Sequence, residues 1–487
     1  MSELCFRTAR ELVALMEAGE VSAVEVAQAH LDQVDRVNPA VNAVVSLDPE
    51  ITLADARAAD DARRSGRLLG PLHGLPIAFK DTHDAAGFPT TYGSPIHAQN
   101  RPAESELLVA RLRAAGAVRL GKTNVPEFAS GSHTFNTLFG TTRNPYDLTR
   151  SAGGSSGGAA ASLASGMQPL ADGSDMGGSL RNPASFCNVV GLRPSPGRVP
   201  IHPNPLPWQT LAVQGPMARN VGDLALMLGV IAGPDDRVPL SITEDPAVFG
   251  GSLERDLTGL RIGWSPDLGG ALPVDRAVVD VIRKRLHLFE DLGCDVVEVQ
   301  PDFSGADRCF RTLRAWQFQA TFGDLLAAHP GELKPSLEAN IREGADVTAA
   351  DVAVASTLQG ELFQRFAAAF ADEYDVLVLP VSQVLPFDAD LEYPTLIEGV
   401  AQPTYLDWMA SSYYVSAIGL PALSVPAGFT DGGLPVGMQL VAGYRRERLL
   451  LEVGRGLEVA AGDPPFTPPP PLLGDPAPRS APVAGPK

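Results

Sequence analysis

Short apolar runs alternate with amphipathic helical patterns along most of this chain. The clearest unit runs from RIGW (261–264) through VDRAVVDVIRKRLHLFEDLG (274–293) to CDVVEVQ (294–300), which reads as strand, helix and strand. The same kinds of segment appear earlier as LPIAF (75–79), ELLVARLRAAG (106–116) and AVRLG (117–121). Strands separated by helices build a sheet whose faces the helices cover. The pattern therefore predicts an α/β fold.

Residues 1–65 read as a helical lead-in to that fold. Thr8-x-x-Glu11 and Ser22-x-x-Glu25 are capping boxes, in which side-chain oxygens accept the free N–H groups at the start of a helix. Two helices are therefore expected here, and we assign them to the same domain as the segments that follow.

The rest of the chain reads as one large α/β unit followed by a tail. No linker rich in Pro, Gly or Ser interrupts residues 66–462. Near their end, a turn at 430–433 separates two strand patterns, and a helical pattern follows at 447–458. Residues 463–487 hold ten prolines in 25 positions. This composition predicts a disordered tail.

The charge balance limits the partners that the chain can bind. It carries 38 Lys and Arg against 57 Asp and Glu, a formal charge of −19. A field of that sign repels nucleic acids and anionic membrane surfaces, so neither is expected as a partner. No apolar run approaches the ~18 residues of a membrane helix, and the first residues do not resemble a signal peptide. We expect a globular cytoplasmic protein.

The cysteines predict neither a metal site nor a disulfide framework. They form no C-x-x-C pair and have no His-rich neighbourhood, as zinc sites require, so reduced thiols fit best. We expect no metal and no cofactor. The four cysteines are Cys5, Cys187, Cys294 and Cys309.

Residues 116–123, GAVRLGKT, match the phosphate-binding motif G-x-x-x-x-G-K-[ST]. A true phosphate loop follows a strand and opens a helix at its Lys. Here a helical pattern comes first, the residues between the glycines are strand-like, and Pro126 follows closely. We therefore expect Lys122 to lie at the end of a strand and to bind no nucleotide.

A Ser/Gly cluster at 151–185 indicates a site for chemistry. It reads SAGGSSGGAAASLASGMQPLADGSDMGGSLRNPAS. A flexible linker would not run directly into an apolar helix former such as AAASLASGM. Glycines placed regularly around serines predict a backbone that approaches a ligand closely.

Part of this cluster, GGSSG (153–157), also matches the nucleophile elbow G-x-S-x-G of α/β-hydrolases. That elbow needs a strand before it and a histidine base downstream. The preceding NPYDLTRSA (144–152) is turn-like and polar, and none of His202, His287 and His329 lies in a recognisable catalytic loop. The sequence therefore disfavours an elbow with a histidine base.

Several stretches together resemble the amidase signature family of serine hydrolases. They are GLPIAFKD, GAVRLGKTNVPEFASG, RNPYDLTRSAGGSSGG, GSDMGGSLRNPAS and LPALSVPAG followed by GLPVGMQLV. The resemblance covers nearly all of residues 5–460. It implies an α/β fold of one large domain, with a mixed, twisted β-sheet sandwiched between layers of α-helices, and the activity of an acylamide amidohydrolase.

The same resemblance implies a catalytic triad of Lys80, Ser155 and Ser179, with a cis peptide bond between Gly154 and Ser155. Ser179 follows two glycines, so its hydroxyl can reach a carbonyl carbon and form an acyl-enzyme. Lys80 follows the apolar run PIAF, where burial lowers a lysine pKa. A neutral Lys80 can accept the proton through Ser155 and return it to the leaving amine.

The N–H groups of Met176, Gly177, Gly178 and Ser179 are expected to converge as an oxyanion hole. Met176 stands where the family more often has Thr or Ile. Since the hole uses backbone donors, this departure leaves it intact.

Five residues near the triad in the sequence are expected to support the site or the fold rather than to react. Asp81 and Asp175 are expected to orient the site, and Arg181 to anchor the nucleophile loop. Cys187 reads as a packed core thiol, and His83 as a local loop residue. KDTHD departs from the family's commoner Lys-Asp-Asn, which changes the local shape of the pocket.

Two other functions compete with that of a stand-alone amidase. The A subunit of the tRNA-dependent amidotransferase, which hydrolyses glutamine, typically shows Ser-Leu-Asp-Gln before Gly-Pro, whereas TLAVQGPMARNVGDLA (210–225) lacks that Asp. An inactive binding homologue is disfavoured by the complete set of Lys80, Ser155 and Ser179.

The substrate is less constrained than the reaction. Aliphatic amides, aryl amides, anilides and carbamates all remain open, and the protein is expected to be a monomer or a homodimer. A group of aromatic residues can line an aryl or alkyl pocket or can pack in the core. They are Trp316, Phe318, Phe322, Tyr405, Trp408, Tyr413 and Tyr414.

Overall fold

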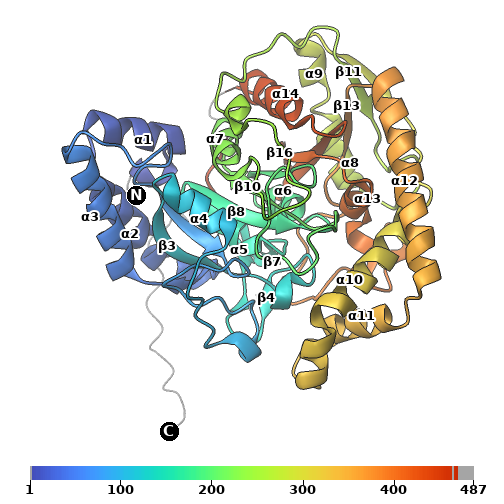
Figure 1. Cartoon of the computed structure of the whole chain (residues 1–487). Coiled ribbons are helices and arrows are strands. Elements are labelled where there is room, and N and C mark those ends of the chain that lie inside the picture. The colour runs from blue at the N-terminus through green and yellow to red at the C-terminus, as the bar shows by residue number, and fades with distance from the viewer. Residues whose placement is uncertain (1–2, 463–465, 470–487) are drawn as a thin grey trace.

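The computed structural model describes residues 3–462 and 466–469 (Figure 1). Its centre is an eight-stranded sheet in which β11 runs parallel to β12 and β13, while the other neighbours are antiparallel. The sheet is therefore mixed, as predicted. In spatial order its strands are β12 (Asp295–Glu298), β11 (Arg261–Trp264), β13 (Val376–Pro380), β17 (Pro435–Ala442), β16 (Ala422–Phe429), β9 (Val190–Arg193), β10 (Val213–Ala218) and β8 (Leu170–Asp175).

A second sheet of three strands lies beside β8. Its order is β1 (Val44–Leu47), β3 (Val118–Thr123) and β2 (Pro76–Lys80), with β2 parallel to β3. Side chains join β2 to the β8 region: the Ala78 N–H donates to Gln168 at 2.7 Å, and the Lys80 N–H donates to the Asp172 carboxylate at 3.2 Å. This junction places Lys80 next to the strand that leads into the second half of the Ser/Gly cluster.

Three small hairpins complete the strands. They are β4 (Phe135–Asn136) with β5 (Gly140–Thr141), β6 (Arg143–Asn144) with β7 (Asp147–Ser151), and β14 (Leu396–Ile397) with β15 (Val400–Ala401). The β6–β7 hairpin corrects the expectation that NPYDLTRSA is only turn-like.

Fourteen α-helices surround the sheets within the described residues. They are α1 (Ala9–Ala18), α2 (Ala23–Val41), α3 (Pro49–Arg64), α4 (Leu107–Ala114), α5 (Gly157–Ala164), α6 (Arg181–Phe186), α7 (Val221–Ile231), α8 (Arg276–Arg283), α9 (His287–Asp291), α10 (Ala306–Ala328), α11 (Pro335–Ala345), α12 (Ala349–Asp372), α13 (Ala410–Ile418) and α14 (Glu447–Ala460). Figure 1 shows α10, α11 and α12 at the end of the molecule opposite α1, α2 and α3.

The large sheet separates two apolar layers. Because successive side chains of a strand point to opposite faces, Val376 and Val378 of β13 join one core with α7, α8 and α14. Leu377 and Leu379 join another core with α10, α12 and α13. The alternation confirms a sheet sandwiched between layers of helices.

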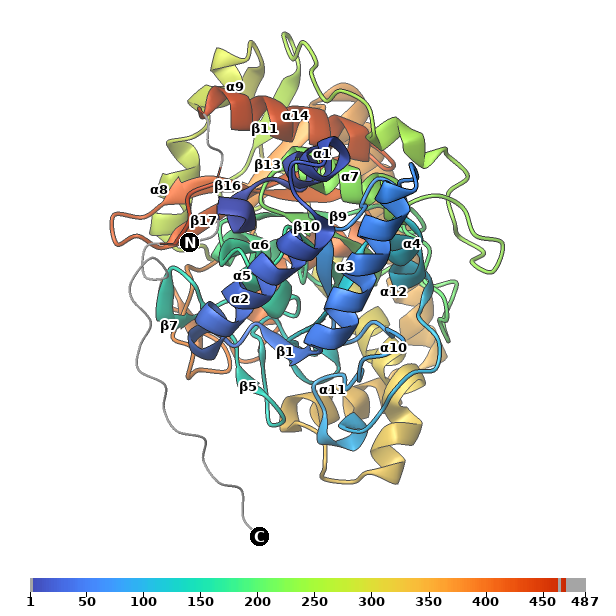
Figure 2. The same cartoon turned by 90° about the vertical axis from the view of Figure 1, so that its left-hand side faces the viewer.

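The helical lead-in packs against this core as part of one body. Both predicted capping boxes are formed, by Thr8 with Glu11 at α1 and by Ser22 with Glu25 at α2. Asp223 at the start of α7 also accepts the Ala9 N–H at 2.7 Å. Figure 2 shows α2 and α3 side by side on the outer face of the smaller sheet.

Most of the sequence-predicted elements are present. The strand-helix-strand unit is β11 and β12 in parallel, but the helix expected over 274–293 is two helices, α8 and α9. The turn at 430–433 joins β16 to β17 as an antiparallel hairpin.

The disordered tail predicted for 463–487 lies outside the described residues except at 466–469. There Phe466 is buried, and its ring stacks on Phe6 with centroids 6.4 Å apart. This short stretch contacts the folded core, in departure from the expectation.

The described residues also bear on the questions of a membrane helix, a metal site and disulfide bonds raised by the sequence. None of the helices in 3–462 is long and apolar enough to cross a membrane. No group of three or more His, Cys, Asp and Glu side chains in this part of the chain is arranged to hold a metal ion. The four cysteines are buried free thiols.

Close packing of α5 against β3 gives a first prediction. An ideal Cβ on Gly158 would lie 2.3 Å from the Asn124 nitrogen, so Gly158→Ala forces backbone to move. We expect this change to lower the free energy of unfolding by about 1–3 kcal/mol. Gly360→Ala, on the exposed face of α12 with no atom within 4 Å, is the control and should be neutral or stabilising. Equal urea midpoints for the two variants would contradict the prediction.

Candidate active site

A cavity of about 230 Å³ lies at the end of β8. Its polar wall includes Ser155, Ser174 and Ser179, and thus brings together both halves of the Ser/Gly cluster. Its apolar wall comes from the segment after β3, the loop after β8, the loop at 204–210 and α10. The larger apolar side chains that line it are Phe128, Met176, Leu206, Phe318 and Phe322.

Lys80 is the basic group of this site. It is the last residue of β2 and its side chain is buried. Its Nζ lies 2.8 Å from the Ser155 Oγ, 2.9 Å from the Ser156 Oγ and 2.8 Å from the Ser174 Oγ. Ser156 and Ser174 belong to the Ser/Gly cluster, but the sequence did not single them out. Their hydroxyls and the Lys80 amine are far apart in the sequence and come together only in the folded structure.

The environment lowers the basicity of Lys80. Burial disfavours the ammonium form and lowers the pKa of Lys80 to about 7, while the nearby carboxylates of Asp172 and Asp175 oppose this shift. Near neutral pH the unprotonated form of Lys80 is therefore populated. A neutral amine has a lone pair, so it can accept a hydrogen bond from one serine hydroxyl while donating to the other two.

Ser155 lies between a hairpin and a helix. The peptide bond between Gly154 and Ser155 is cis. The Gly154 carbonyl accepts a hydrogen bond from the Ser132 hydroxyl at 2.7 Å, and α5 begins two residues after Ser155. The backbone is therefore fixed on both sides of Ser155, whose Oγ faces Lys80.

Close approach to protein, rather than to a ligand, explains some of the glycines in this cluster. An ideal Cβ on Gly157 would lie 2.3 Å from the Thr134 Oγ1, and one on Gly154 would lie 2.9 Å from the same atom. Gly178 has φ of +121°, and its Cβ would lie 2.6 Å from the Ser412 Cβ. Larger residues do not fit these positions.

Ser179 lies in the loop between β8 and α6 and is nearly buried in the cavity wall. Its hydroxyl makes no hydrogen bond with any residue that the structure describes, and thus none with the Ser155 hydroxyl. The two serines are nevertheless tied through the backbone, since the Ser156 N–H donates to the Ser179 carbonyl at 3.3 Å.

The loop offers three backbone donors rather than four. The Gly178 N–H already donates to the Asp175 carboxylate at 2.9 Å, which departs from the sequence expectation. The N–H groups of Met176, Gly177 and Ser179 have no acceptor among the residues in 3–462. These three can stabilise a developing negative charge in the cavity.

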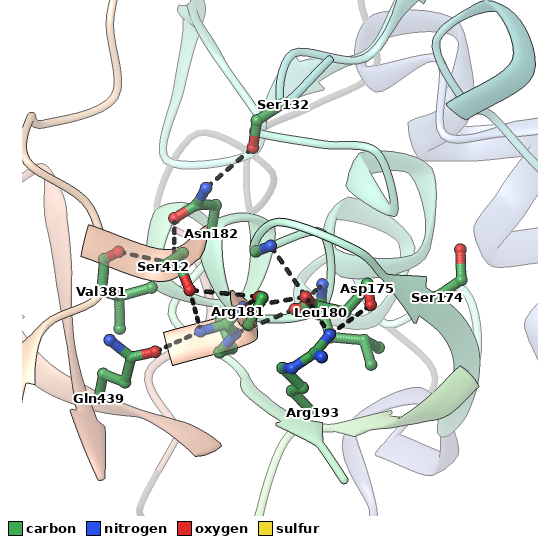
Figure 3. A network of polar contacts seen from close by, with 12 residues as sticks. Ser132, Ser174, Asp175, Leu180, Arg181, Asn182, Arg193, Val381, Ser412 and Gln439 are labelled. Carbon is green, nitrogen blue, oxygen red and sulfur yellow. Dashed lines mark hydrogen bonds and ion pairs between the residues drawn. The ribbon is translucent and has the colours of Figure 1, made fainter. Parts of the chain in front are cut away.

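A buried ion cluster beneath the loop holds its shape (Figure 3). Asp175 accepts from the Leu180 N–H at 3.1 Å and pairs with Arg181 at 2.9 Å and Arg193 at 3.2 Å. Burial alone would raise the pKa of Asp175, but the two guanidinium groups outweigh it and hold that pKa well below its usual range.

Arg181 extends this cluster to the opposite layer of the fold. It donates to the Ser412 carbonyl at 2.9 Å, the Ser416 hydroxyl at 2.8 Å and the Gln439 side chain at 2.5 Å. The charged group thus connects the loop between β8 and α6 to α13 and β17.

His83 is more than the local loop residue that the sequence suggested. Its Nδ1 is hydrogen-bonded to the buried Asp172 carboxylate, which also accepts from the Lys80 N–H. His83 therefore supports the strand end that carries Lys80. Asp81 accepts from the Thr91 side chain and orders the segment after β2.

Two motif hypotheses find no support in this geometry. Lys122 is the next-to-last residue of β3, and its buried Nζ donates to the His83 carbonyl and, at 3.0 Å, to the Thr90 hydroxyl. It is therefore not available to a phosphate. For the nucleophile elbow, Ser155 has Lys80 as its basic partner, and no histidine of the described chain is hydrogen-bonded to it.

The aromatic residues divide between cavity and core. Phe318 and Phe322 line the cavity, and Trp316 lies on a neighbouring groove. The sequence analysis missed Phe128, which also lines the cavity. The remaining aromatic candidates pack in or against the apolar layer around α13, and are Tyr405, Trp408, Tyr413 and Tyr414. Cys187 is buried in the core, as expected.

The ion cluster gives the second prediction. Arg181→Met leaves the buried Asp175 carboxylate with one guanidinium in place of two, and should lower the free energy of unfolding by about 3 kcal/mol. Arg342→Met removes an exposed pair with Glu338 on α11 and should cost less than about 0.5 kcal/mol. Urea denaturation compares them, and similar losses would show that Asp175 does not depend on Arg181.

Comparison with known proteins gives a consistent result. The family model described as Amidase matches residues 25–451. An acylamidase of Rhodococcus erythropolis is 38% identical over 455 residues, 93% of this chain and 94% of its own. The A subunit of a glutamyl-tRNA(Gln) amidotransferase from Acidothermus cellulolyticus is 38% identical over 492 residues, covering 94% and 95%. The crystal structure of a bacterial aryl acylamidase of the amidase signature enzymes matches with a TM-score of 0.88 and 29% identity, covering 94% of this chain and 97% of that one.

Proposed function

The chain belongs to the amidase family, and on that premise we propose that Ser179 is its nucleophile, Ser155 its proton bridge and Lys80 its general base. The protein is an amide hydrolase that cleaves a carboxylic amide to an acid and an amine or ammonia. The observation that carries the assignment is the buried Lys80, with a lowered pKa and 2.8 Å from Ser155 in the cavity that also holds Ser179.

The proposed reaction begins with acylation. Neutral Lys80 takes the Ser155 proton while Ser155 takes that of Ser179, and the Ser179 oxygen attacks the amide carbon. The negative charge that forms on the carbonyl oxygen is stabilised by the N–H groups of Met176, Gly177 and Ser179. The proton then returns through Ser155 to the leaving nitrogen, and the C–N bond breaks.

Deacylation repeats the same steps with water. Lys80, again through Ser155, takes a proton from water, whose oxygen attacks the acyl carbon. When the tetrahedral intermediate collapses, the proton returns to the Ser179 oxygen and the acid is released. Asp175 and Arg181 position the loop, and Gly154, which leaves no room for a Cβ beside Thr134, fixes the backbone before Ser155.

The lining of the cavity favours a neutral, largely apolar substrate. Among the described lining residues Asp175 is the only charged one, and it is already paired with two arginines. An aryl amide, anilide or carbamate therefore fits the cavity better than an ion does.

The A subunit of an amidotransferase remains the alternative. Its substrate glutamine carries an ammonium and a carboxylate group, and the cavity offers no unpaired charged side chain among the described lining residues to receive either. We therefore favour the stand-alone amidase, acting in the cytoplasm as a monomer or homodimer.

The nucleophile is tested by Ser179→Ala. We expect kcat/KM to fall at least about 1,000-fold, since no acyl-enzyme can form, and covalent labelling by a serine-directed phosphonate to disappear. Ser162→Ala, a buried serine of α5 outside the cavity, should keep both activity and labelling. Mass spectrometry of the labelled protein locates the site; label on Ser155 in Ser179→Ala would favour the elbow mechanism instead.

The base is tested by the pH dependence of kcat/KM. Because only neutral Lys80 accepts a proton and its pKa is lowered to about 7, kcat/KM should rise with pH to a plateau with an apparent pKa near that value. Lys80→Met should remove this limb and reduce amide hydrolysis by about 100-fold to 10,000-fold. Matched esters should lose less, because an alkoxide needs the returned proton less than an amine does.

Lys122→Met is the matched control for that experiment. Lys122 is also a buried lysine at the end of a neighbouring strand, but it faces His83 and Thr90 rather than the serines. Its folded variant should keep the pH limb. Loss of the limb in Lys122→Met, or its persistence in Lys80→Met, would remove Lys80 from the base role.

A further inference from the structure

A second hollow of about 460 Å³ adjoins the catalytic cavity. The residues that line both are Pro205, Leu206, Gln209 and Gln317. The loop at 204–210 forms one side of this hollow, and α10 and α12 form the other. We call it the tryptophan groove, because Trp208 and Trp316 both line it.

The exposure of these tryptophans is unusual in this chain. Of its four tryptophans, Trp264 and Trp408 are buried, whereas Trp208 is 72% exposed and Trp316 is 37% exposed. Large aromatic side chains lose contact energy when they face water, and exposed ones gathered at a site are typical of ligand contacts. Both exposed tryptophans lie on the hollow that continues from the reacting serines.

Gln317 gives an independent sign of a ligand. It lies on α10 between Trp316, which faces the groove, and Phe318, which faces the cavity. The residue as a whole is 5% exposed, and its amide makes no hydrogen bond with any residue described in 3–462 or 466–469. Because Gln317 lines both hollows, its amide is open to them and can donate to and accept from a polar group of a bound molecule.

Hydrogen bonds within the protein give the groove its shape. In the loop at 204–210, the Asn204 side chain accepts the Leu206 N–H at 2.9 Å. Gln209 makes two hydrogen bonds with the Ala212 backbone, at 3.2 Å and 3.0 Å. From α12, Gln359 donates to the Thr210 hydroxyl at 3.4 Å. These contacts hold the wall that carries Trp208.

The described lining of the groove carries no charged residue. Together with the proposed amidase function, on which this step rests, we infer that the groove is a distal substrate subsite. It takes a neutral, elongated amide whose far end is an apolar group of aromatic size, held between Trp208 and Trp316. A polar group of the substrate, between the reacting amide and that far end, is hydrogen-bonded to Gln317.

The test compares long and short substrates in two series. Phenylbutanamide and acetamide vary the acyl side, while N-phenylbutyl acetamide and N-methyl acetamide vary the amine side. Wild-type protein should prefer the long member in at least one series. In that series Trp208→Ala and Trp316→Ala should each lower kcat/KM on the long substrate by about tenfold and leave the short one within about twofold.

Gln317 is tested with a second pair of long substrates. One carries an additional amide in the chain between the reacting group and the phenyl ring, and the other carries methylenes at that place. Gln317→Leu should abolish the preference for the amide-containing substrate while keeping the dependence on the tryptophans. An unchanged preference would remove Gln317 from recognition.

Phe429→Ala is the control, since it truncates an exposed aromatic residue of β16 outside the groove, and it should change neither series. Equal effects of the tryptophan variants on long and short substrates would overturn the subsite. The subsite would also be overturned if the tryptophan variants kept the wild-type ratio of kcat/KM between long and short substrates and changed the protein from dimer to monomer in sedimentation. That result would assign the groove to contact with a second copy of the chain. Hydrolysis of the short amides tests the proposed amidase function by itself. A failure of the subsite is therefore distinguishable from a failure of the amidase function.

Discussion

The burial of Lys80 where two sheets meet is the constraint on which the site depends. Lowering its pKa from 10.5 to about 7 corresponds to about 5 kcal/mol in favour of the neutral over the charged form. The surrounding fold supplies this free energy by excluding water from Lys80. Three serine hydroxyls, from the segments around α5 and β8, form hydrogen bonds with the amine instead. Asp172 limits the shift, because the negative charge of its carboxylate favours the ammonium form of Lys80. These opposing effects leave the pKa of Lys80 near neutrality, as its proposed role as a base requires.

The loop between β8 and α6, which carries Ser179, depends on a different balance of charges. Asp175 lies at the end of β8, and its carboxylate receives the Gly178 and Leu180 N–H groups together with Arg181 and Arg193. Because both oxygens of this buried group are occupied, the contacts of Asp175 hold the loop, and in the proposed mechanism the N–H groups of Met176, Gly177 and Ser179 receive the oxyanion. The lysine and the loop are thus held by separate networks that meet at the same cavity.

The helical layers determine which substrate groups fit the cavity and the groove beside it. A single helix, α10, contributes Phe318 and Phe322 to the cavity, Trp316 to the tryptophan groove, and Gln317 to both. The loop at 204–210 closes the other side of both hollows. In the proposed function, catalytic groups and substrate contacts therefore come from different parts of the fold, so the contacts can vary while the sheet junction that holds Lys80 stays the same.

The sequence by itself determined the α/β class, the capping boxes of α1 and α2, and the hairpin of β16 and β17. These follow from local periodicity, turn residues and motifs, which are written in neighbouring positions. The grouping of Lys80, Ser155 and Ser179 came from the resemblance of separate motifs to the amidase signature family. Only the tertiary structure decided that His83 supports Asp172, that Gly178 gives its N–H to Asp175, that Tyr413 packs in the core and that Trp316 faces a groove. Each of these depends on which side chain meets which across many residues of chain, and local sequence carries no record of such contacts.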